Sequence, residues 1–404
     1  MSLAKNIEFL RRLPKLHAWE GLRPGVPHGG RGPLLETGGF GTNPGDLRMF
    51  SYVPANVRPT PALVVVLHGC GQTAVGYDLG AGWSTLAKHY GFALLMPHQQ
   101  PSNNPQGCFN WFKPEDTRRG EGEALSIRQM VARMVADHKI DRKRIFVTGL
   151  SAGGAMTSVM LATYPDVFSA GAIIAGLPYG VATNVREALN GMLQSPARPP
   201  RELGNLVRNA SKHRTPWPRV SVWHGSADRT VNPANADEIV KQWLDVHGLP
   251  SVPMLADTVD GYPHQIWWNG DGETVVESYT ITDMAHGTPL GKAENDEQYG
   301  KQGAFLIEAG ISSSYHIAHF FGLTSAAHQP EEVVKPAPAA ADSPSARLIP
   351  LASPISTAMP DLTRMLWPQP TAKRPPDPPP KGKRRMPDVG AVITRALTAA
   401  ALMK

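Results

Sequence analysis

Short runs of apolar residues recur along the middle of the chain, and most of them end in glycine. The runs are 62–69, 92–97, 144–149, 170–176 and 219–225. Continuous apolar runs of this length are typical of strands that are buried on both faces of a sheet. The stretches between them carry helical patterns, the clearest over 122–138. Buried strands that alternate with helices predict an α/β fold with a doubly wound, mostly parallel sheet and helices on both faces.

The same pattern divides the chain into three parts. Residues 1–45 predict an amphipathic helix followed by a connector rich in glycine and proline, and residues 46–323 carry the strand–helix alternation. Within that domain, 177–218 contains clustered prolines and is too long for an ordinary connection, which predicts a cap insertion over the site or else a surface excursion. Residues 324–404 are rich in proline and basic residues, and this composition predicts a disordered tail.

Charge and hydropathy exclude several function classes. The net charge is +6, but residues 330–404 contribute +5 of it, so the rest of the chain offers no basic surface for nucleic acid. No apolar run is long enough to span a membrane. Charged residues interrupt the first twenty positions, so we expect no cleaved secretory signal there.

A candidate nucleophile follows the third apolar run. The sequence Gly149-Leu150-Ser151-Ala152-Gly153 fits G-x-S-x-G and lies between a predicted strand and a helical pattern. This context is typical of a nucleophile elbow, a strained turn that exposes the serine hydroxyl above a sheet. The two glycines remove side chains that would clash in so tight a turn. Alternatively, they only let the strand and the helix pack closely.

A serine nucleophile also needs donors for the oxyanion that forms as it attacks. The backbone N–H of Ala152, directly after the serine, is the first predicted donor. The loop after the run 62–69 begins His68-Gly69-Cys70, and we assign the second donor to the N–H of Cys70. We expect His68 to be structural, because hydrolases with this elbow have the order nucleophile, acid, base along the chain.

The acid and the base are predicted in two later loops. Asp228 follows the run 219–225 and is the predicted acid, with Asp260 as the alternative. His286 follows an alternating pattern within 275–290 that predicts an edge strand. We predict His286 as the base that removes the proton from Ser151, with His264 as the alternative.

With these positions placed, the sequence resembles the poly(3-hydroxybutyrate) depolymerase esterases, a family that also includes feruloyl and acetylxylan esterases. The resemblance extends over roughly residues 46–323. It implies an α/β-hydrolase catalytic domain with the triad Ser151, Asp228 and His286, and an oxyanion contribution from Cys70. The resembling segments are 67–72, 107–112, 147–180, 223–233, 284–291 and 310–323.

The resemblance implies further features of the site. Cys70 and Cys108, the two cysteines of the sequence, would form a disulfide beside the oxyanion loop. Trp111 would line the substrate groove, with a position in the core as the alternative.

Neither cysteine belongs to a CxxC pair, so we expect no metal, and no organic cofactor is implied. A disulfide favours an extracellular or periplasmic location, whereas the N-terminal sequence favours the cytoplasm.

We therefore expect a serine esterase that hydrolyses poly- or oligo-3-hydroxybutyrate through an acyl-enzyme. Feruloyl or acetylxylan esterase activity is the alternative, because substrate choice depends on the groove and on 177–218. An alternative of another class is a non-catalytic α/β-hydrolase scaffold that contacts polymer granules through the N-terminal helix or the basic tail. A complete Ser–Asp–His set argues against this scaffold.

Overall fold

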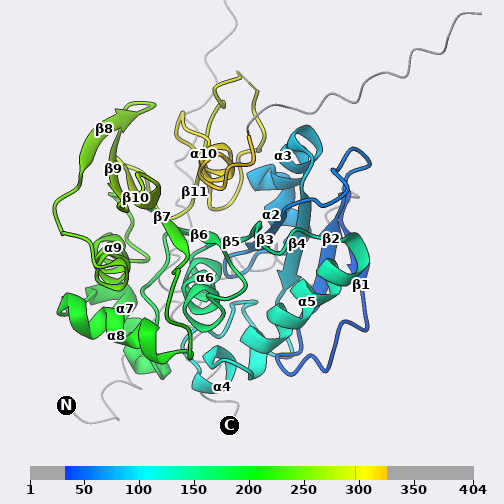
Figure 1. The fold of residues 1–404 in the computed structure, drawn as a ribbon, viewed down its shortest axis with the longest axis horizontal. Helices are drawn as coiled ribbons and strands as arrows, with labels where there is room; N and C mark the ends of the chain where they lie inside the picture. Colours follow the sequence, from blue (N-terminus) through cyan, green and yellow to red (C-terminus); the bar gives the residue numbers. More distant parts are fainter. Residues whose placement is uncertain (1–31, 296, 325–404) are drawn as a thin grey trace, which may run out of the picture. The chain divides into compact units, whose positions relative to one another are not determined.

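The strands and helices predicted from the sequence form one large sheet with helices on both faces (Figure 1), so the predicted fold class is confirmed. The computed structural model describes residues 32–295 and 297–324. All of them belong to the larger of the chain's two units, and the smaller unit, Gln329–Asp388, is not described. The predicted N-terminal helix and proline-rich tail lie outside the described residues. Both therefore stay predictions, as do the domain boundaries.

Ten strands form the main sheet, in the order β1-β2-β4-β3-β5-β6-β7-β10-β9-β8. The central strands from β4 to β10 are parallel, and the strands at both ends pair antiparallel. Strands β3 to β7 coincide with the five apolar runs, as predicted. The strands are β1 (Leu35–Thr37), β2 (Arg48–Tyr52), β3 (Leu63–Leu67), β4 (Ala93–His98), β5 (Ile145–Leu150), β6 (Ala170–Ile174), β7 (Arg219–Gly225), β8 (Leu255–Val259), β9 (Tyr262–Trp268) and β10 (Thr274–Ile281), with β11 (Thr288–Leu290) and β12 (Leu306–Glu308) in a separate small sheet.

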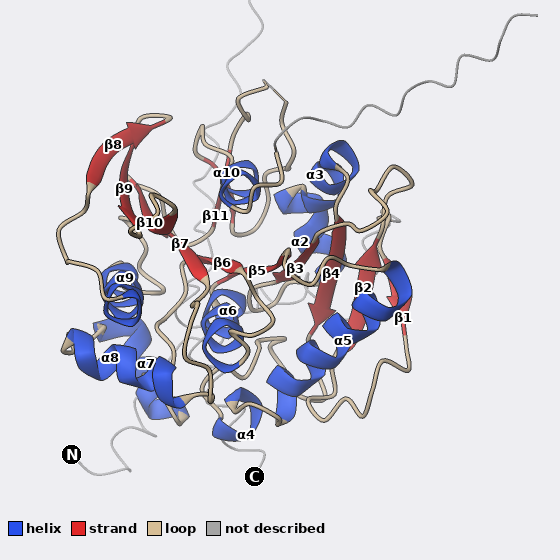
Figure 2. Cartoon of the chain, viewed as in Figure 1, coloured by secondary structure: helices blue, strands red, loops and turns tan. Residues whose placement is uncertain are grey.

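Helices cover both faces of this sheet (Figure 2). They are α2 (Ala74–Ala81), α3 (Trp83–Tyr90), α4 (Pro114–Thr117), α5 (Gly122–His138), α6 (Ala152–Thr163), α7 (Val185–Gln194), α8 (Pro200–Asn209), α9 (Ala234–His247) and α10 (Ser313–Phe320). Successive side chains of a buried strand enter two different cores. In β3, Val65 packs in the core that contains residues of α5, α6 and α9, whereas Val64 and Val66 pack with residues of α2, α3 and α10.

The predicted edge strand within 275–290 is wrong, because β10 lies inside the sheet between β7 and β9. Its alternating pattern includes Glu277, a polar residue that is nevertheless buried, with 6% of its surface exposed. The Glu277 carboxylate accepts a hydrogen bond from the Ser221 hydroxyl at 2.6 Å. The polar positions of this alternating pattern therefore did not mark a solvent-exposed face, because Glu277 is buried.

Segment 177–218 contains α7 and α8, which lie near α9 (Figure 2). It contacts the loop that follows β7. The N–H of Asn232 donates to the Met192 carbonyl at 2.7 Å, and its side-chain amide donates to the Leu193 carbonyl at 3.3 Å. The segment thus borders the loop that carries Asp228, and its function as a cap stays a prediction.

The loops that carry the predicted site residues leave the sheet at one edge. Cys70 follows β3, Ser151 follows β5, Asp228 follows β7 and His286 follows β10. These four strands belong to the continuous parallel part of the sheet, in the order β3-β5-β6-β7-β10. Ligands of open α/β sheets bind outside the carboxyl ends of the parallel strands.

Candidate active site

Ser151 forms the sharp turn between β5 and α6. Its backbone has φ 57° and ψ −116°, a conformation that residues with a side chain rarely adopt. The Ser151 N–H donates to the Ile174 carbonyl at 2.9 Å, and the Ser151 carbonyl accepts from the Ala155 N–H at 2.8 Å. The neighbouring strand and the helix therefore hold the strained turn from both sides. This is the strand–turn–helix geometry of a nucleophile elbow.

Gly149 and Gly153 let this turn pack against β3. A Cβ atom at Gly149 would lie 2.8 Å from the Leu67 carbonyl oxygen, and a Cβ atom at Gly153 would lie 2.6 Å from that of His68. Neither position has room for a side chain. Close packing therefore brings the N-terminus of α6, and with it the N–H of Ala152, against the start of the loop after β3. The catalytic explanation and the close-packing explanation for Gly149 and Gly153 therefore describe the same geometry.

Asp228 and His286 form a buried pair, with the His286 Nδ1 2.6 Å from the Asp228 Oδ2. Two loops must approach closely for this contact. A Cβ atom at Gly225, the last residue of β7, would collide with the Met284 carbonyl. The N–H of Ala227 donates to that same carbonyl at 3.1 Å. The glycine that ends β7 thus lets the loops that carry Asp228 and His286 approach each other closely.

The Asp228 carboxylate accepts hydrogen bonds at both oxygens. Oδ1 accepts from the N–H groups of Thr230 at 2.8 Å and Val231 at 3.0 Å. Burial acts to raise the pKa of Asp228, but the contacts with the imidazoles of His224 and His286 outweigh it and hold this pKa below its usual range. Asp228 is therefore ionised at neutral pH and can stabilise a cationic His286.

The pair fixes the tautomer of His286. Because the carboxylate is only an acceptor, Nδ1 carries the proton and Nε2 is left as the basic nitrogen. Among the described residues, the hydroxyl of Ser151 makes no hydrogen bond. Catalytic hydrogen bonds often tighten only when substrate binds.

Asp260 and His264, the alternative acid and base, form hydrogen bonds with other side chains. Asp260 occupies the turn between β8 and β9, and its Oδ2 is 3.0 Å from the Nε2 of His316. His264 lies in β9, with its Nδ1 2.9 Å from Asp257 and its Nε2 3.4 Å from Glu277. Neither residue contacts the Asp228–His286 pair. The geometry therefore favours Asp228 as the acid and His286 as the base.

Cys70 and Ala152 each carry a backbone N–H that donates to no other group in the described part of the chain. The N–H groups on either side of Cys70 are engaged: Gly69 donates to the Gln72 Oε1 at 2.9 Å and Gly71 to the Gln106 carbonyl at 2.8 Å. Only the middle N–H of this loop is therefore available. Two free donors beside a serine are what an oxyanion hole requires.

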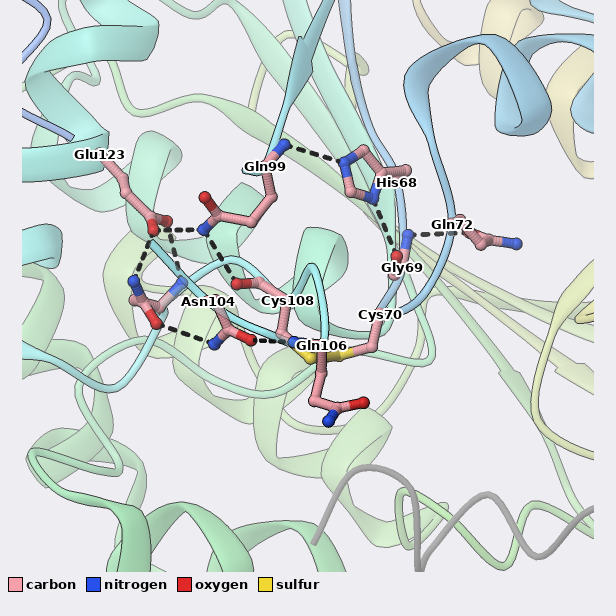
Figure 3. The surroundings of a disulfide bond; sticks show 10 residues. His68, Gly69, Cys70, Gln72, Gln99, Asn104, Gln106, Cys108 and Glu123 are labelled. Carbon is pink, nitrogen blue, oxygen red and sulfur yellow. Dashed lines mark hydrogen bonds between the residues drawn. A yellow bond between two sulfur atoms is a disulfide. The ribbon is translucent and has the colours of Figure 1, made fainter. Parts of the chain in front are cut away.

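A disulfide joins Cys70 to Cys108 (Figure 3). It connects the loop after β3 that carries Cys70, here called the oxyanion loop because its N–H is the predicted oxyanion donor, to residues 99–110. The pairing implied by the family resemblance is thus present. The same two segments are also joined by the hydrogen bond from Gly71 to the Gln106 carbonyl. The position of the Cys70 N–H is therefore fixed by one covalent and one hydrogen bond to the same neighbouring loop.

Glu123, the second residue of α5, holds this neighbouring loop through hydrogen bonds (Figure 3). It is fully buried, and its carboxylate accepts from Gln99 at 2.6 Å, Asn103 at 3.0 Å, and both the backbone and the side chain of Asn110 at 2.9 and 2.8 Å. The Gln99 amide also donates to the Cys108 carbonyl at 2.9 Å, which fixes its orientation. Burial and the nearby Asp116 raise the pKa of Glu123 to about 8.

His68 is fully buried at the end of β3 and uses both ring nitrogens. The Gln99 N–H donates to Nε2 at 3.2 Å, so Nδ1 carries the proton and donates to the Gly69 carbonyl at 2.8 Å. Burial and the neighbouring His98 lower the pKa of His68 to about 3. The imidazole is therefore neutral and braces the oxyanion loop, which agrees with the expected structural role.

Comparison with known proteins places this geometry in a family. Residues 49–253 match the family model described as Esterase PHB depolymerase. The chain is 47% identical to the poly(3-hydroxyalkanoate) depolymerase C of Paucimonas lemoignei over 291 residues, 72% of this chain and 70% of that protein. The chain belongs to the PHB depolymerase esterase family. It is a carboxylic ester hydrolase, as the sequence predicted.

Other relatives of this PHB depolymerase family esterase carry different names. An acetylxylan esterase of Coprinopsis cinerea is 34% identical, with 66% of this chain and 72% of that protein covered. A feruloyl esterase B of Neurospora crassa is 36% identical, with 63% and 88% covered. Among solved structures, an acetyl xylan esterase from Aspergillus awamori matches with a TM-score of 0.58 at 29% identity, covering 63% of this chain and 94% of that one.

Trp111 of this esterase is buried, with 7% of its surface exposed. It packs edge-on against Phe112, with ring centroids 5.5 Å apart, in the core that also contains Ala152 and Cys108. The structure thus places Trp111 in the core position that the sequence left as the alternative. That Trp111 lines the substrate groove stays a prediction.

Three residues near the site were not predicted from the sequence. Glu123 supports the disulfide loop, and Gln72 bonds both Gly69 and the Ala304 carbonyl. His224 lies against Asp228. Gln72 and His224 do fall within the quoted motifs of the esterase family, but the spacing along the chain gives no sign of what they contact.

Within the described ranges, no group of three or more His, Cys, Asp or Glu side chains could hold a metal ion. Over the same residues, no helix is both long and apolar enough to cross a membrane.

Proposed function

We propose that this esterase hydrolyses poly- or oligo-3-hydroxybutyrate by means of a triad of Ser151, His286 and Asp228. The observation that carries the substrate class is the 47% identity to a poly(3-hydroxyalkanoate) depolymerase across most of both chains. The strained turn at Ser151 and the buried contact between His286 and Asp228 support the assignment of the triad.

In the proposed reaction, Ser151 Oγ attacks the ester carbonyl carbon as His286 Nε2 takes its proton. The resulting oxyanion accepts hydrogen bonds from the N–H groups of Ala152 and Cys70. The intermediate then collapses: the ester C–O bond breaks, and His286 returns the proton to the leaving alkoxide, which becomes the hydroxyl end of a hydroxybutyrate unit. Asp228 stabilises the imidazolium that exists between these two proton transfers.

The acyl group then remains on Ser151 as an ester. A water molecule attacks this ester while the same histidine nitrogen removes its proton, and a second oxyanion forms in the same hole. Collapse of this intermediate releases the acid and restores the serine hydroxyl. All three side chains are almost completely buried, which strengthens their electrostatic interactions relative to those in water.

The second candidate is esterase activity on feruloyl or acetyl groups of plant polysaccharide. It is supported by the identity of 34% to a protein named acetylxylan esterase and of 36% to one named feruloyl esterase B. The triad would act on these esters by the same steps. Segment 177–218, which borders the Asp228 loop, is where we expect the selectivity to arise.

The disulfide also supports a proposal for location. Disulfides form and persist in oxidising compartments, so we place the working enzyme outside the cell or in the periplasm. The cytoplasm is the alternative, in which the two thiols would be reduced. Contact with a polymer-granule surface through the N-terminal helix or the tail concerns segments outside the described residues and stays a prediction.

The test of the substrate is a comparison of kcat/KM for 3-hydroxybutyrate oligomers, methyl ferulate and acetylated xylan. We expect the highest value for the hydroxybutyrate oligomers. A higher value for either of the other two would replace the first substrate with the second candidate. Ser151→Ala is the control protein, and we expect it to lose about five to six orders of magnitude in kcat on every substrate.

A further inference from the structure

A second histidine lies against the acid of the proposed triad. His224 is the residue before the end of β7 and is 3% exposed. Its Nε2 lies 3.2 Å from the Asp228 Oδ2, the same oxygen that the His286 Nδ1 approaches to 2.6 Å. The carboxylate oxygen that orients the base is therefore shared between two imidazoles.

The surroundings of His224 fix its tautomer. Its Nε2 is 3.0 Å from the Val231 carbonyl oxygen, which can only accept a hydrogen bond, so Nε2 carries a proton. Its Nδ1 is buried and has no partner among the described residues. A proton on Nδ1 would therefore be a buried N–H with no acceptor, which is costly. His224 is thus a neutral donor whose one N–H is shared between Val231 and Asp228.

The orientation of Asp228 does not depend on this donor. Oδ1 is already held by the backbone N–H groups of Thr230 and Val231. What His224 adds is partial neutralisation of the charge on Oδ2, the oxygen that faces His286. The carboxylate of Asp237, from α9, also interacts electrostatically with His224.

We propose that His224 is a positioning residue that acts through Asp228 and sets the pH range in which His286 works as a base. The proposal rests on the triad of the proposed function. A neutral donor on Oδ2 reduces the attraction of the carboxylate for the His286 proton. His286 therefore gives up its proton, and becomes a base, at a lower pH than it would beside Asp228 alone.

The test is the pH profile of kcat/KM for p-nitrophenyl butyrate in wild type, His224→Leu and His224→Gln. Leucine removes the donor, so we expect the midpoint of the acidic limb to move up by about half a pH unit, the lower end of what one hydrogen bond contributes. Glutamine places an amide N–H near the former Nε2, so we expect it to return the midpoint toward that of wild type. KM should be the same in all three proteins, because His224 touches no substrate.

His247→Leu is the matched control. It also removes a histidine Nε2 hydrogen bond to a backbone carbonyl, that of Pro218 at 3.1 Å, but far along α9 from the Asp228 loop. We expect His247→Leu to keep the wild-type midpoint. An acidic limb of His224→Leu that superimposes on that of wild type, or a shift of equal size in His247→Leu, would overturn the proposal.

A second measurement needs no leucine variant. In protein labelled with ¹⁵N-histidine, we expect His224, assigned by its loss in His224→Gln, to show the Nε2–H tautomer with Nδ1 unprotonated. A protonated or Nδ1–H form would contradict the shared donor. Failure of the triad itself is distinguishable, because in that case Ser151→Ala would retain esterase activity whatever the result at His224.

Discussion

At the scale of residues, the backbone of Ser151 is strained. Its conformation, φ 57° and ψ −116°, costs on the order of 1–3 kcal/mol for a residue with a side chain. Hydrogen bonds to Ile174 and from Ala155 hold the turn in place. The strain is local, and G-x-S-x-G between a strand and a helix is a local pattern, so this residue could be found from the sequence.

The contact between His224 and Asp228 could not be found in the same way. It depends on how the loop after β7 closes back on the strand end, where the Val231 carbonyl receives the His224 N–H. Nothing in the spacing of these residues distinguishes a histidine that contacts the acid from one that points into the core. The sequence therefore predicted the triad residues but not the contact of His224 with Asp228.

Gly153 tests the close packing at residue scale. Alanine there would place a Cβ atom 2.6 Å from the His68 carbonyl oxygen, so the backbones must move apart. We expect Gly153→Ala to lower the free energy of unfolding by about 1–3 kcal/mol, as overpacking does. We also expect kcat to fall, because the N–H of Ala152 shifts relative to the Cys70 loop. Urea unfolding and initial rates measure the two effects.

The control for this prediction is Gly270→Ala. A Cβ atom at Gly270 meets nothing within 4 Å, and the residue lies in an exposed connection between β9 and β10. We expect its stability and kcat to match those of wild type. Equal behaviour of the two alanine variants would show that the packing of α6 against β3 tolerates a side chain.

At the scale of elements, the buried parallel strands were predictable and the outer strands were not. Strands β3 to β7 are mostly apolar because helices cover both of their faces. β8 is mostly exposed, so it has no apolar run to recognise. β10 was predicted as an edge strand, because buried Glu277 occupies a position of the alternating pattern where a solvent-facing residue is expected.

The tie between the oxyanion loop and residues 99–110 can be tested by reduction. Opening the Cys70–Cys108 disulfide should lower the free energy of unfolding by about 2–4 kcal/mol, since the bond closes a loop with a sequence separation of 38. We also expect kcat to fall while KM changes little, because the N–H of Cys70 acts mainly in the transition state. Dithiothreitol, followed by urea unfolding and kinetics, provides the measurement.

The matched control is the double variant Cys70→Ser, Cys108→Ser with and without dithiothreitol. Its stability and kcat should not respond to the reductant. Reduced wild type that keeps the stability and the kcat of the oxidised protein would show that hydrogen bonds alone, such as that from Gly71 to Gln106, hold the oxyanion loop.

At the scale of the whole molecule, the order of motifs along the chain predicted the architecture. A sheet that is parallel through its centre brings the ends of β3, β5, β7 and β10 to one edge, so four loops distant in sequence form one site. The sequence could not predict the loop contacts that complete it. They depend on close approaches such as that of Gly225 to Met284, which no periodic pattern encodes.

Buried histidines predict part of the acid sensitivity of the fold. The pKa of His68 falls from its ordinary 6.5 to about 3 in the folded protein, because of burial and the neighbouring His98. Between these two values the unfolded chain binds a proton that the folded protein does not, so acid favours unfolding. Relative to His68→Gln, wild type should therefore lose about 1.4 kcal/mol of unfolding free energy per pH unit within this window.

Urea unfolding of wild type and His68→Gln at several pH values from 6.5 down to 4 measures this difference. Other titrating groups contribute equally to both proteins and cancel. A difference in unfolding free energy that stays constant over this range would mean that His68 takes up a proton in the folded state and does not brace the oxyanion loop as a neutral ring.

The central claim, that Ser151 is the nucleophile, is tested most directly by covalent labelling. A p-nitrophenyl alkylphosphonate reacts with a nucleophilic serine, which displaces p-nitrophenolate and becomes a stable phosphonate ester. We predict release of one equivalent of p-nitrophenolate, loss of esterase activity in step with that release, and a peptide mass that locates the phosphonyl group on Ser151. An adduct on another residue with Ser151 unmodified, or full inactivation of Ser151→Ala by the same reagent, would contradict the account.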